Sequence, residues 1–216
     1  MKQEKYHKYV FDSGNRTFIG NFEEMYSNES SECFDSWHQD DSRHLARKIS
    51  LAVLEGYNFD SIVDIGCGKG AFTHVMKKRN NRVFGVDIAP TALTIAAERY
   101  PDIDFHCLDI RDKRSLEEYF IEKVKNKADL ILCSEVLSYI EKWPDMVELF
   151  SLNAHYFLTT LYIPEHPIGY VKSEDELMKA IKTYFTVREW ISLRTARASI
   201  IFAESKKKRS TTHARL

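Results

Sequence analysis

Hydrophobic and polar residues follow two alternating patterns through the middle of the chain. Short runs of apolar and β-branched residues predict five strands, at residues 61–65, 82–88, 103–110, 128–140 and 155–163. Segments with helical spacing separate these runs and predict helices at residues 71–79, 90–100, 113–126 and 144–154. Strands that alternate regularly with helices predict a mostly parallel sheet with helices on both faces.

The pattern changes after residue 172. A helix is predicted over residues 173–185, with Ser173 as its N-cap, and two strand-like runs follow closely at residues 186–194 and 198–205. Their proximity predicts a terminal hairpin that adds an antiparallel strand to the sheet. The fold class is therefore α/β, a doubly wound and mostly parallel seven-stranded sheet with a C-terminal antiparallel strand and helices on both faces.

Three parts of the chain are predicted. Residues 1–59 form an N-terminal helical or lid segment, residues 60–205 form the core, and the basic residues 206–216 form a disordered tail. Within the first part, residues 41–55 read as an amphipathic helix whose apolar face carries Leu45, Ile49, Ala52 and Val53. Phe18, Phe22 and Tyr26 stand at helical spacing, which favours packing over a substrate-binding role.

Composition narrows the function classes. The formal charge is -1, from 31 Lys and Arg against 32 Asp and Glu, so neither nucleic acid nor a membrane is a predicted partner. No apolar run approaches the roughly 20 residues that span a bilayer, and a cytoplasmic location is predicted. The four cysteines lack CxxC spacing, so neither a metal site nor a disulfide framework is predicted.

Three closely spaced glycines mark the candidate site. In "VDIGCGKGAF", Gly66, Gly68 and Gly70 occupy alternate positions directly after the first predicted strand and before a helix. Glycine suits positions with positive φ or with a ligand close to the main chain. A strand, a glycine turn and a helix together are typical of nucleotide-binding α/β folds.

Acidic residues accompany this turn at the ends of neighbouring strands. Asp64, Asp87 and Asp109 should face one crevice, although each aspartate could instead serve a turn or a helix cap. A carboxylate at the position of Asp87 can accept two hydrogen bonds from a ribose diol. The glycine spacing is GxGxG, which differs from the GxGxxG favoured by nicotinamide dinucleotides.

With this motif the sequence resembles the class I S-adenosylmethionine-dependent methyltransferases, whose first motif is commonly (V/L)D(I/L)GCGxG. Later segments, "VFGVDIAPTAL", "FHCLDI" and "ADLILCSEVLSYI", resemble further motifs of that family in the same order, and the resemblance covers about residues 60–205. It implies S-adenosyl-L-methionine as cofactor and the following binding roles. Around the amino-acid end lie Asp64, Gly66, Cys67, Gly68 and Gly70; Asp87 holds the ribose; Ile88, Leu108, Asp109 and Ile110 contact adenine; and Cys133, Ser134 and Glu135 line the floor below the methyl group.

The segment before the core is the expected source of acceptor specificity. In several small-molecule methyltransferases resembling this chain, such a segment closes over the site as a lid. Trp37 is therefore a predicted substrate-binding residue and His38 a predicted catalytic residue, with Gln39 beside them. The alternative is that Trp37 seals an edge of the core and that His38 faces solvent.

Two further residues are candidate bases. Quinone-biosynthesis O-methyltransferases, which the core also resembles, often carry a Glu-His pair where this chain has Ser138 and Tyr139, so that histidine is absent. Glu135 and His166 remain as catalytic candidates, against a salt-bridge or cap role for the first and a surface position for the second. Tyr139 and Tyr162 are the other predicted substrate-binding residues, although Tyr139 could equally fill the core.

The sequence thus predicts a methyltransferase that acts on an O or N atom of a small metabolite. A saccharide or phosphorylated precursor is the predicted acceptor, since the N-terminal segment resembles methyltransferases of sugar, nodulation-factor or capsule modification. The alternatives are an RNA or protein methyltransferase and a cofactor-binding protein without transfer activity. Near-neutral charge and the absence of an "NPPY"-like run after the fourth strand argue against the RNA enzyme.

Overall fold

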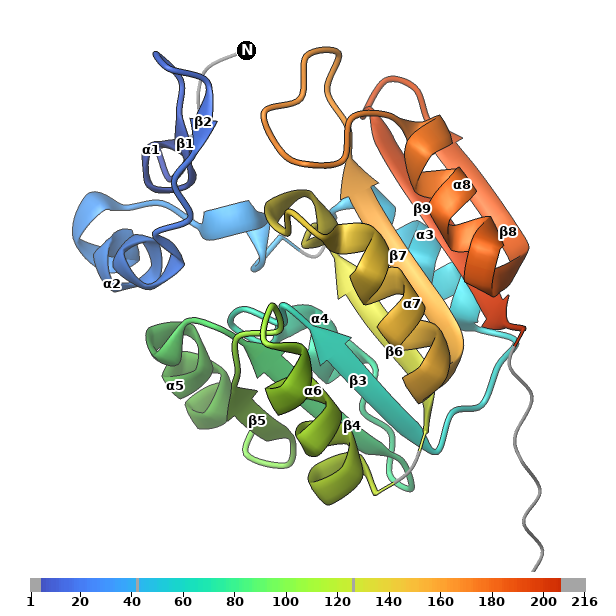
Figure 1. Ribbon diagram of the computed structural model, residues 1–216. Helices are drawn as coiled ribbons and strands as arrows, with labels where there is room; N and C mark the ends of the chain where they lie inside the picture. Colours follow the sequence, from blue (N-terminus) through green and yellow to red (C-terminus); the bar gives the residue numbers. More distant parts are fainter. Residues whose placement is uncertain (1–4, 42, 126, 207–216) are drawn as a thin grey trace, which may run out of the picture.

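The computed structural model describes residues 5–41, 43–125 and 127–206, and its centre is a seven-stranded sheet. Its strand order is β5-β4-β3-β6-β7-β9-β8, in which β9 runs antiparallel to both neighbours and the other pairs are parallel (Figure 1). The strands are β3 (Ser61–Ile65), β4 (Arg82–Asp87), β5 (Asp104–Cys107), β6 (Ala128–Ser134), β7 (Ala154–Tyr162), β8 (Phe185–Leu193) and β9 (Ala198–Ser205). The predicted fold class is confirmed, with β5 and β6 shorter than the apolar runs that contain them.

Helices cover both faces of this sheet. In Figure 1, α6, α7 and α8 lie in front of the strands and α3 lies behind them. Their bounds are α3 (Leu45–Leu54), α4 (Ala71–Val75), α5 (Pro90–Arg99), α6 (Lys113–Tyr119), α7 (Trp143–Asn153) and α8 (Glu174–Tyr184), and a π-helical turn, η2 (Phe120–Val124), follows α6. Alternate residues of β3 serve the two layers: Val63 and Ile65 pack in one core cluster and Ile62 in the other.

Predicted helix starts agree with the side-chain caps. The Ser173 hydroxyl accepts a hydrogen bond from the backbone N–H of Glu176 at 3.1 Å, as predicted for the start of α8. The Asp112 carboxylate accepts from the N–H groups of Arg114 and Ser115 and so caps α6. These contacts satisfy N–H groups that have no partner within their helix.

The N-terminal segment forms a small unit beside the sheet. It consists of α1 (His7–Val10), the hairpin of β1 (Phe11–Asp12) and β2 (Thr17–Phe18), α2 (Phe22–Glu32) and a 3-10 turn, η1 (Ser36–His38). Figure 1 shows this unit on the same side of the molecule as α5. Glu23 joins the two parts, because its carboxylate accepts hydrogen bonds from the N–H and the hydroxyl of Thr91 at the start of α5.

The predicted apolar face of the helix in this segment is wrong. Leu45 of α3 is 54% exposed and Ala52 is exposed, whereas Ala46, Ser50 and Leu54 form the buried face. The small side chains of that face pack toward β7 and β9, and the Ser50 hydroxyl donates to the Ala46 carbonyl oxygen at 2.8 Å. Phe18 lies in β2 whereas Phe22 and Tyr26 lie in α2, and all three pack in one hydrophobic cluster, as predicted.

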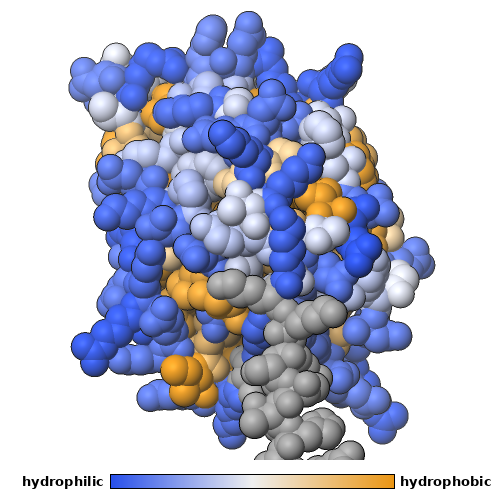
Figure 2. Space-filling model, turned by 45° about the vertical axis from the view of Figure 1, so that its right-hand side comes forward, coloured by the Kyte–Doolittle hydropathy of each residue, from blue (hydrophilic) through white to orange (hydrophobic). Residues whose placement is uncertain are grey.

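The surface carries mostly hydrophilic residues. On the face shown in Figure 2, hydrophobic residues form small groups between them. Within the described ranges, no helix is long and apolar enough to cross a membrane. Of the predicted basic tail, residues 207–216 lie outside the described residues.

Candidate functional site

A cavity lies between the N-terminal segment and the carboxyl ends of the parallel strands. The N-terminal segment contributes Phe18, Gly20, Phe22, Tyr26, Trp37, Gln39 and Arg47 to its lining. The core contributes Asp64, Gly66, Cys67, Phe72, Val86, Asp87, Ile88, Leu108, Asp109, Ile110, Arg111, Ser134, Glu135, Val136, Tyr139 and Ile140. Ligands of open α/β sheets bind at this edge, so the cavity is the candidate active site.

The three glycines of the turn after β3 have positive φ, at 74° for Gly66, 53° for Gly68 and 77° for Gly70. Only Gly66 lines the cavity. A Cβ on Gly68 would lie 2.4 Å from Gln39 Oε1, and a Cβ on Gly70 would lie 2.8 Å from Phe105 Cζ. A Cβ on Gly66 would lie 2.2 Å from Cγ2 of Val136, so other parts of the protein exclude a side chain at all three positions.

Asp87 at the end of β4 is anchored by the main chain. Its Oδ2 accepts from the Gly68 N–H at 2.8 Å and its Oδ1 accepts from the Ala89 N–H at 2.9 Å. Burial raises the pKa of this carboxyl group, although both backbone hydrogen bonds counteract the shift. Each oxygen keeps further acceptor capacity, so the carboxylate can receive a diol at the cavity.

An acidic and a basic side chain, those of Asp64 and Arg47, both line the cavity. Asp64 is 2% exposed and accepts a hydrogen bond from the Thr73 hydroxyl at 2.6 Å. Burial raises the pKa of Asp64 to about 7, while Thr73 and Arg47 favour its charged form. Burial lowers the pKa of Arg47, and the charges of nearby carboxylates, Asp64 among them, oppose that effect.

Arg47 also holds the turn that precedes its helix. Its guanidinium group donates to the carbonyl oxygens of His38 and Gln39 at 2.9 Å and of Trp37 at 3.1 Å. Trp37 and His38 both have positive φ, at 58° and 50°. This backbone conformation is costly for residues other than glycine, and the three hydrogen bonds stabilise it.

Apolar side chains of Ile88, Leu108 and Ile110 form another part of the lining. Asp109 lies among them, but its carboxylate is paired with Arg111, which donates through Nε at 2.8 Å and through Nη2 at 2.6 Å. The Arg111 guanidinium group holds the pKa of Asp109 below its usual value. Asp109 therefore meets the cavity as half of an ion pair.

Glu135 follows β6 in a left-handed backbone conformation, with φ of 61°. Its Oε2 accepts from the backbone N–H of Tyr162 at 2.7 Å, and its Oε1 accepts from the Thr160 hydroxyl at 3.3 Å. Burial raises the pKa of Glu135. Ser134 shares the network, since its hydroxyl lies 2.6 Å from that of Thr160.

The N-terminal segment is fastened to the glycine turn itself. Gln39 Oε1 accepts from the Lys69 N–H at 2.7 Å, and Gln39 Nε2 donates to the Tyr26 hydroxyl at 2.8 Å. Lys69 is 3% exposed, and its ammonium group donates to Glu29, Asp35 and Asp40 at 3.0, 2.8 and 3.2 Å. Hydrogen bonds and ion pairs thus hold the N-terminal segment against the glycine turn.

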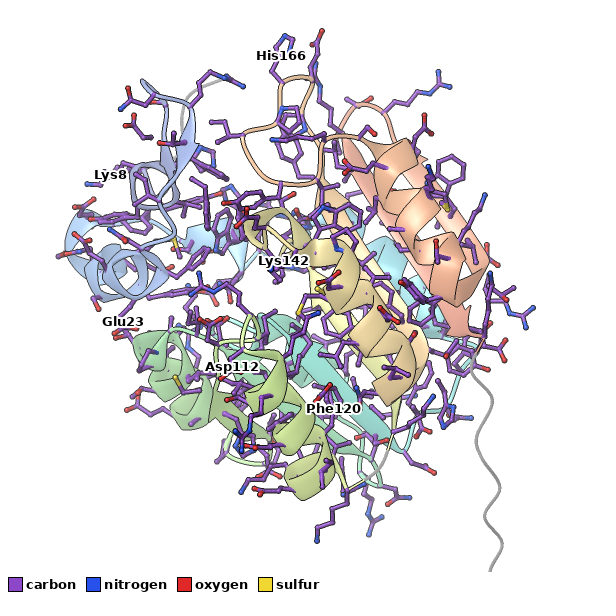
Figure 3. The ribbon with its side chains drawn as sticks, viewed as in Figure 1. Lys8, Glu23, Asp112, Phe120, Lys142 and His166 are labelled. Carbon is purple, nitrogen blue, oxygen red and sulfur yellow. The ribbon has the colours of Figure 1, made fainter. Side chains whose placement is uncertain are left out.

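Most sequence-predicted site residues meet at this cavity. Those on the lining are Trp37, Asp64, Gly66, Cys67, Asp87, Ile88, Leu108, Asp109, Ile110, Ser134, Glu135 and Tyr139. Outside it lie Gly68, Gly70, Cys133, His38, His166 and Tyr162. His38 is exposed, and His166 lies at the outer end of the loop after β7 (Figure 3). Their catalytic roles stay predictions that nothing in this arrangement supports.

The structure adds lining residues that sequence reasoning missed. Arg47 was read only as part of an amphipathic helix, and Arg111 was not considered. Phe18, Phe22 and Tyr26 were interpreted as packing residues, yet all three line the cavity as well. The aromatic richness of the N-terminal segment was the available signal. Across the described ranges, no cluster of three His, Cys, Asp or Glu is arranged to hold a metal ion.

Known proteins share this domain and fold. Residues 63–156 match the family described as a methyltransferase domain. The chain is 30% identical over 83 residues to putative methyltransferase 235L of Invertebrate iridescent virus 6, covering 38% of this chain and 31% of that protein. It is 29% identical over 105 residues to the ubiquinone biosynthesis O-methyltransferase of Idiomarina loihiensis, covering 45% of this chain and 40% of the relative. The matches therefore span less than half of either relative.

Solved structures extend the likeness to most of the fold. The N-methyltransferase NodS from Bradyrhizobium japonicum WM9, in complex with S-adenosyl-L-homocysteine, superposes with a TM-score of 0.66 at 18% identity over 84% of this chain and 98% of NodS. Magnesium protoporphyrin IX methyltransferase from Synechocystis PCC 6803, with bound S-adenosylmethionine, gives 0.58 at 16% identity over 92% of this chain and 94% of that one. At such identities the likeness establishes the fold.

Proposed function

Because this chain carries a methyltransferase-family domain and has the class I, Rossmann-like methyltransferase fold, we propose that it transfers a methyl group from S-adenosylmethionine to an O or N atom of a small molecule. The relatives support either atom, since they include O-methyltransferases and the N-methyltransferase NodS. The cavity supplies the residues for both parts of the reaction.

The position of the Asp87 carboxylate is the main support for this proposal. Its carboxylate lies at the carboxyl end of β4, is fixed by two backbone N–H groups and faces the cavity. A ribose diol can donate to its remaining lone pairs. Gly66 lines the cavity with a positive φ and takes the Val136 side chain where a Cβ would stand, and Ile88 and Leu108 offer apolar contacts to a purine. These residues fit an adenosyl group.

Asp64 and Arg47, on the same cavity lining, fit an amino-acid end. Arg47 would attract a carboxylate, and Asp64 would accept hydrogen bonds from an ammonium group. Both side chains are already held, Arg47 by carbonyl oxygens and Asp64 by Thr73. Such fixed groups select a zwitterion without rearrangement at the moment of binding.

Transfer requires alignment and, for a protonated acceptor, a base. Bound S-adenosylmethionine supplies an activated methyl group, whose carbon bonds to the acceptor atom as its bond to sulfur breaks and the electron pair stays on sulfur. Glu135 is the proposed base that takes the acceptor's proton. Its raised pKa brings it closer to neutral pH, and the Tyr162 N–H and Thr160 hydroxyl orient it.

Residues 1–59 are proposed to serve as the lid of the site. Gln39 and Tyr26 cover Gly68, and Trp37 lies on the cavity lining. A lid excludes water from the transfer and completes the acceptor site. His38 is proposed to belong to this lid rather than to the reacting groups, because its side chain is exposed in the closed arrangement.

Cofactor binding tests the proposal. Calorimetry should detect S-adenosylhomocysteine binding to the full chain, and Asp87→Ala should weaken it by about 2 to 4 kcal/mol, the scale for removing a buried charged partner. Asp102→Ala, at an exposed carboxylate, is the matched control and should bind as the unaltered protein does. An unchanged affinity in a folded Asp87→Ala variant would show that the cofactor lies elsewhere.

Product formation separates the alternatives. A cofactor-binding protein without transfer activity would bind S-adenosylhomocysteine. With S-adenosylmethionine and any acceptor, however, it would form no S-adenosylhomocysteine. An RNA or protein methyltransferase would label macromolecules and leave small molecules unlabelled. The sequence proposes a saccharide or a phosphorylated precursor as the acceptor. The aromatic side chains on the cavity lining favour a different class of acceptor.

A further inference from the structure

Four aromatic side chains gather on one part of the cavity lining, and none is needed for the proposed cofactor contacts. Phe18, Phe22, Trp37 and Tyr139, here named the aromatic wall, come from β2, α2, η1 and the 3-10 turn η3 (Leu137–Tyr139). Three of them belong to the N-terminal segment and one follows β6. The wall therefore exists only where the proposed lid meets the core.

Tyr139 is the centre of this wall. Its ring centroid lies 5.6 Å from that of Phe18, with the planes inclined by 14°, 5.4 Å from that of Phe22 and 5.6 Å from that of Trp37. These are the separations of interacting aromatic pairs. The rings support one another and present a rigid apolar surface to whatever enters the cavity.

Gly20 fixes the bend between two of these rings. Its φ is +77°, and a Cβ at this position would lie 2.8 Å from Cζ of Phe18. Any larger residue would displace the Phe18 ring or strain the turn. The placement of Phe18 and Phe22 on the lining therefore depends on this glycine.

Polar capacity on the wall is small. Within residues 5–41, 43–125 and 127–206, no hydrogen bond is recorded for the Tyr139 hydroxyl or the Trp37 indole N–H. The nearby charges are already engaged, since Arg111 is paired with Asp109 and Arg47 donates to three carbonyl oxygens. The wall itself therefore offers a ligand at most one hydroxyl and one indole N–H.

The small number of polar groups on the aromatic wall distinguishes between classes of acceptor. A saccharide carries many hydroxyl groups and a phosphate carries charge, and each such group loses free energy when it is buried without a partner. A planar ring instead gains contact with the aromatic side chains. The indole N–H can only donate, so the polar group beside it must be an acceptor such as oxygen rather than an ammonium group.

We propose, on the basis of the function proposed above, that the methyl acceptor is a planar aromatic molecule bearing a hydroxyl group, a phenol, whose ring lies against the aromatic wall. The hydroxyl oxygen is then the methylated atom. The Tyr139 hydroxyl and the Trp37 N–H position the polar substituents, and the ring contacts select the substrate.

Methyl transfer to matched probes tests this proposal. The full chain is incubated with S-adenosylmethionine carrying a labelled methyl group and, separately, with catechol, glucosamine and glucose 6-phosphate. We expect labelled product with catechol alone. Labelling of either sugar without catechol overturns the phenol class, and so does a protein that binds S-adenosylhomocysteine but labels no probe. A chain that fails to bind S-adenosylhomocysteine contradicts the proposed function itself.

Conservative variants test the wall directly. Phe22→Leu should raise KM for catechol about tenfold through the lost ring contact, while the Kd for S-adenosylhomocysteine stays unchanged. Tyr139→Phe keeps the ring and should raise KM several-fold by removing the hydroxyl. Ile121→Ala is the control. Ile121 is 73% exposed, so this variant should change neither the KM for catechol nor the Kd for S-adenosylhomocysteine. Wall variants that leave KM for catechol unaltered would overturn the proposed placement of the ring.

Discussion

The ammonium group of Lys69 donates a hydrogen bond to the Glu29 carboxylate at 3.0 Å across 40 residues of sequence. Both residues are buried, Lys69 at 3% and Glu29 at 7% exposure. Burial alone would lower the pKa of Lys69, but its hydrogen bonds to Asp35 and Glu29 raise it, so the ammonium form is maintained. One residue of the glycine turn thus carries the charge that holds the proposed lid.

Replacing this lysine should release the N-terminal segment. Lys69→Met leaves three carboxylates without their shared cation, and removal of one partner from a buried ion pair costs about 3 kcal/mol. Urea unfolding should show this loss of stability. Lys113→Met, which breaks the exposed pair with Asp145, should cost less than about 1 kcal/mol. Equal losses in the two variants would mean that the Lys69 contacts contribute little.

A single methyl group on the glycine turn should have a similar effect on the lid. Gly68→Ala adds a Cβ that would lie 2.4 Å from the Gln39 side chain and 2.7 Å from the Tyr26 hydroxyl, at a φ of 53°. We expect S-adenosylhomocysteine affinity to fall at least tenfold because the turn and its cover must both shift. Gly56→Ala meets nothing within 4 Å and is the matched control. If folded Gly68→Ala bound S-adenosylhomocysteine normally, the glycine motif would serve only as a tight turn.

Stability should depend on pH through Asp64. Its pKa of about 7 lies above the ordinary value of 3.8, so the folded state favours the protonated form. The stabilisation is complete below about pH 4 and is lost as pH rises through 7. The free energy of unfolding of Asp64→Asn should therefore rise relative to that of the unaltered protein between pH 4 and pH 8. The difference should reach about 2 to 4 kcal/mol at pH 8.

Thermal unfolding across that pH range measures the gain, and Glu55→Gln at an exposed side chain serves as control. A difference between Asp64→Asn and the unaltered protein that stays constant with pH would contradict the assigned protonation. S-adenosylhomocysteine should bind the Asp64→Asn variant more weakly, because the amide cannot neutralise an ammonium group.

Ligand binding should order the proposed lid. Amide exchange across residues 28–41 should slow when S-adenosylhomocysteine and catechol are both present, because Trp37 and Gln39 of this stretch line the cavity and Gln39 accepts from the Lys69 N–H. His38→Ala tests the catalytic role that the sequence predicts for this exposed residue: a fall in turnover larger than the loss of cofactor binding would support that role, and unchanged turnover would leave His38 in the lid alone. Two results would contradict the proposed lid role. One is an amide exchange rate that is the same with and without both ligands, and the other is a chain beginning at residue 40 that methylates at the full rate.

The sheet and the glycine turn could be predicted from the sequence. Most strands are short apolar runs bounded by polar residues, as in the fully buried β3, whose Val63 and Ile65 pack on one face of the sheet and Ile62 on the other. The parallel order follows because helices separate the strands. Asp87 was placed at a strand end by the same local pattern, which is why its position beside the cavity was predictable.

Other features depend on contacts between distant residues. The exposed Leu45 and the buried Ser50 show that the orientation of α3 is decided by the strands beneath it and by Arg47, whose hydrogen bonds reach back to Trp37. The turn at Trp37 has positive φ, which no local propensity favours for tryptophan.

By itself, then, the amino-acid sequence determined the α/β sheet, the bare glycine turn and the acidic strand ends, because these rest on periodicity and on residue types within a few positions. Only the tertiary structure decided that Lys69 faces Glu29, that Gln39 covers Gly68, and that rings from β2, α2 and η1 surround Tyr139. These pairings join residues that lie far apart in the sequence, as the 30 positions between Gln39 and Lys69 illustrate. Their free energy comes from burial and charge compensation, which exist only once the chain has packed.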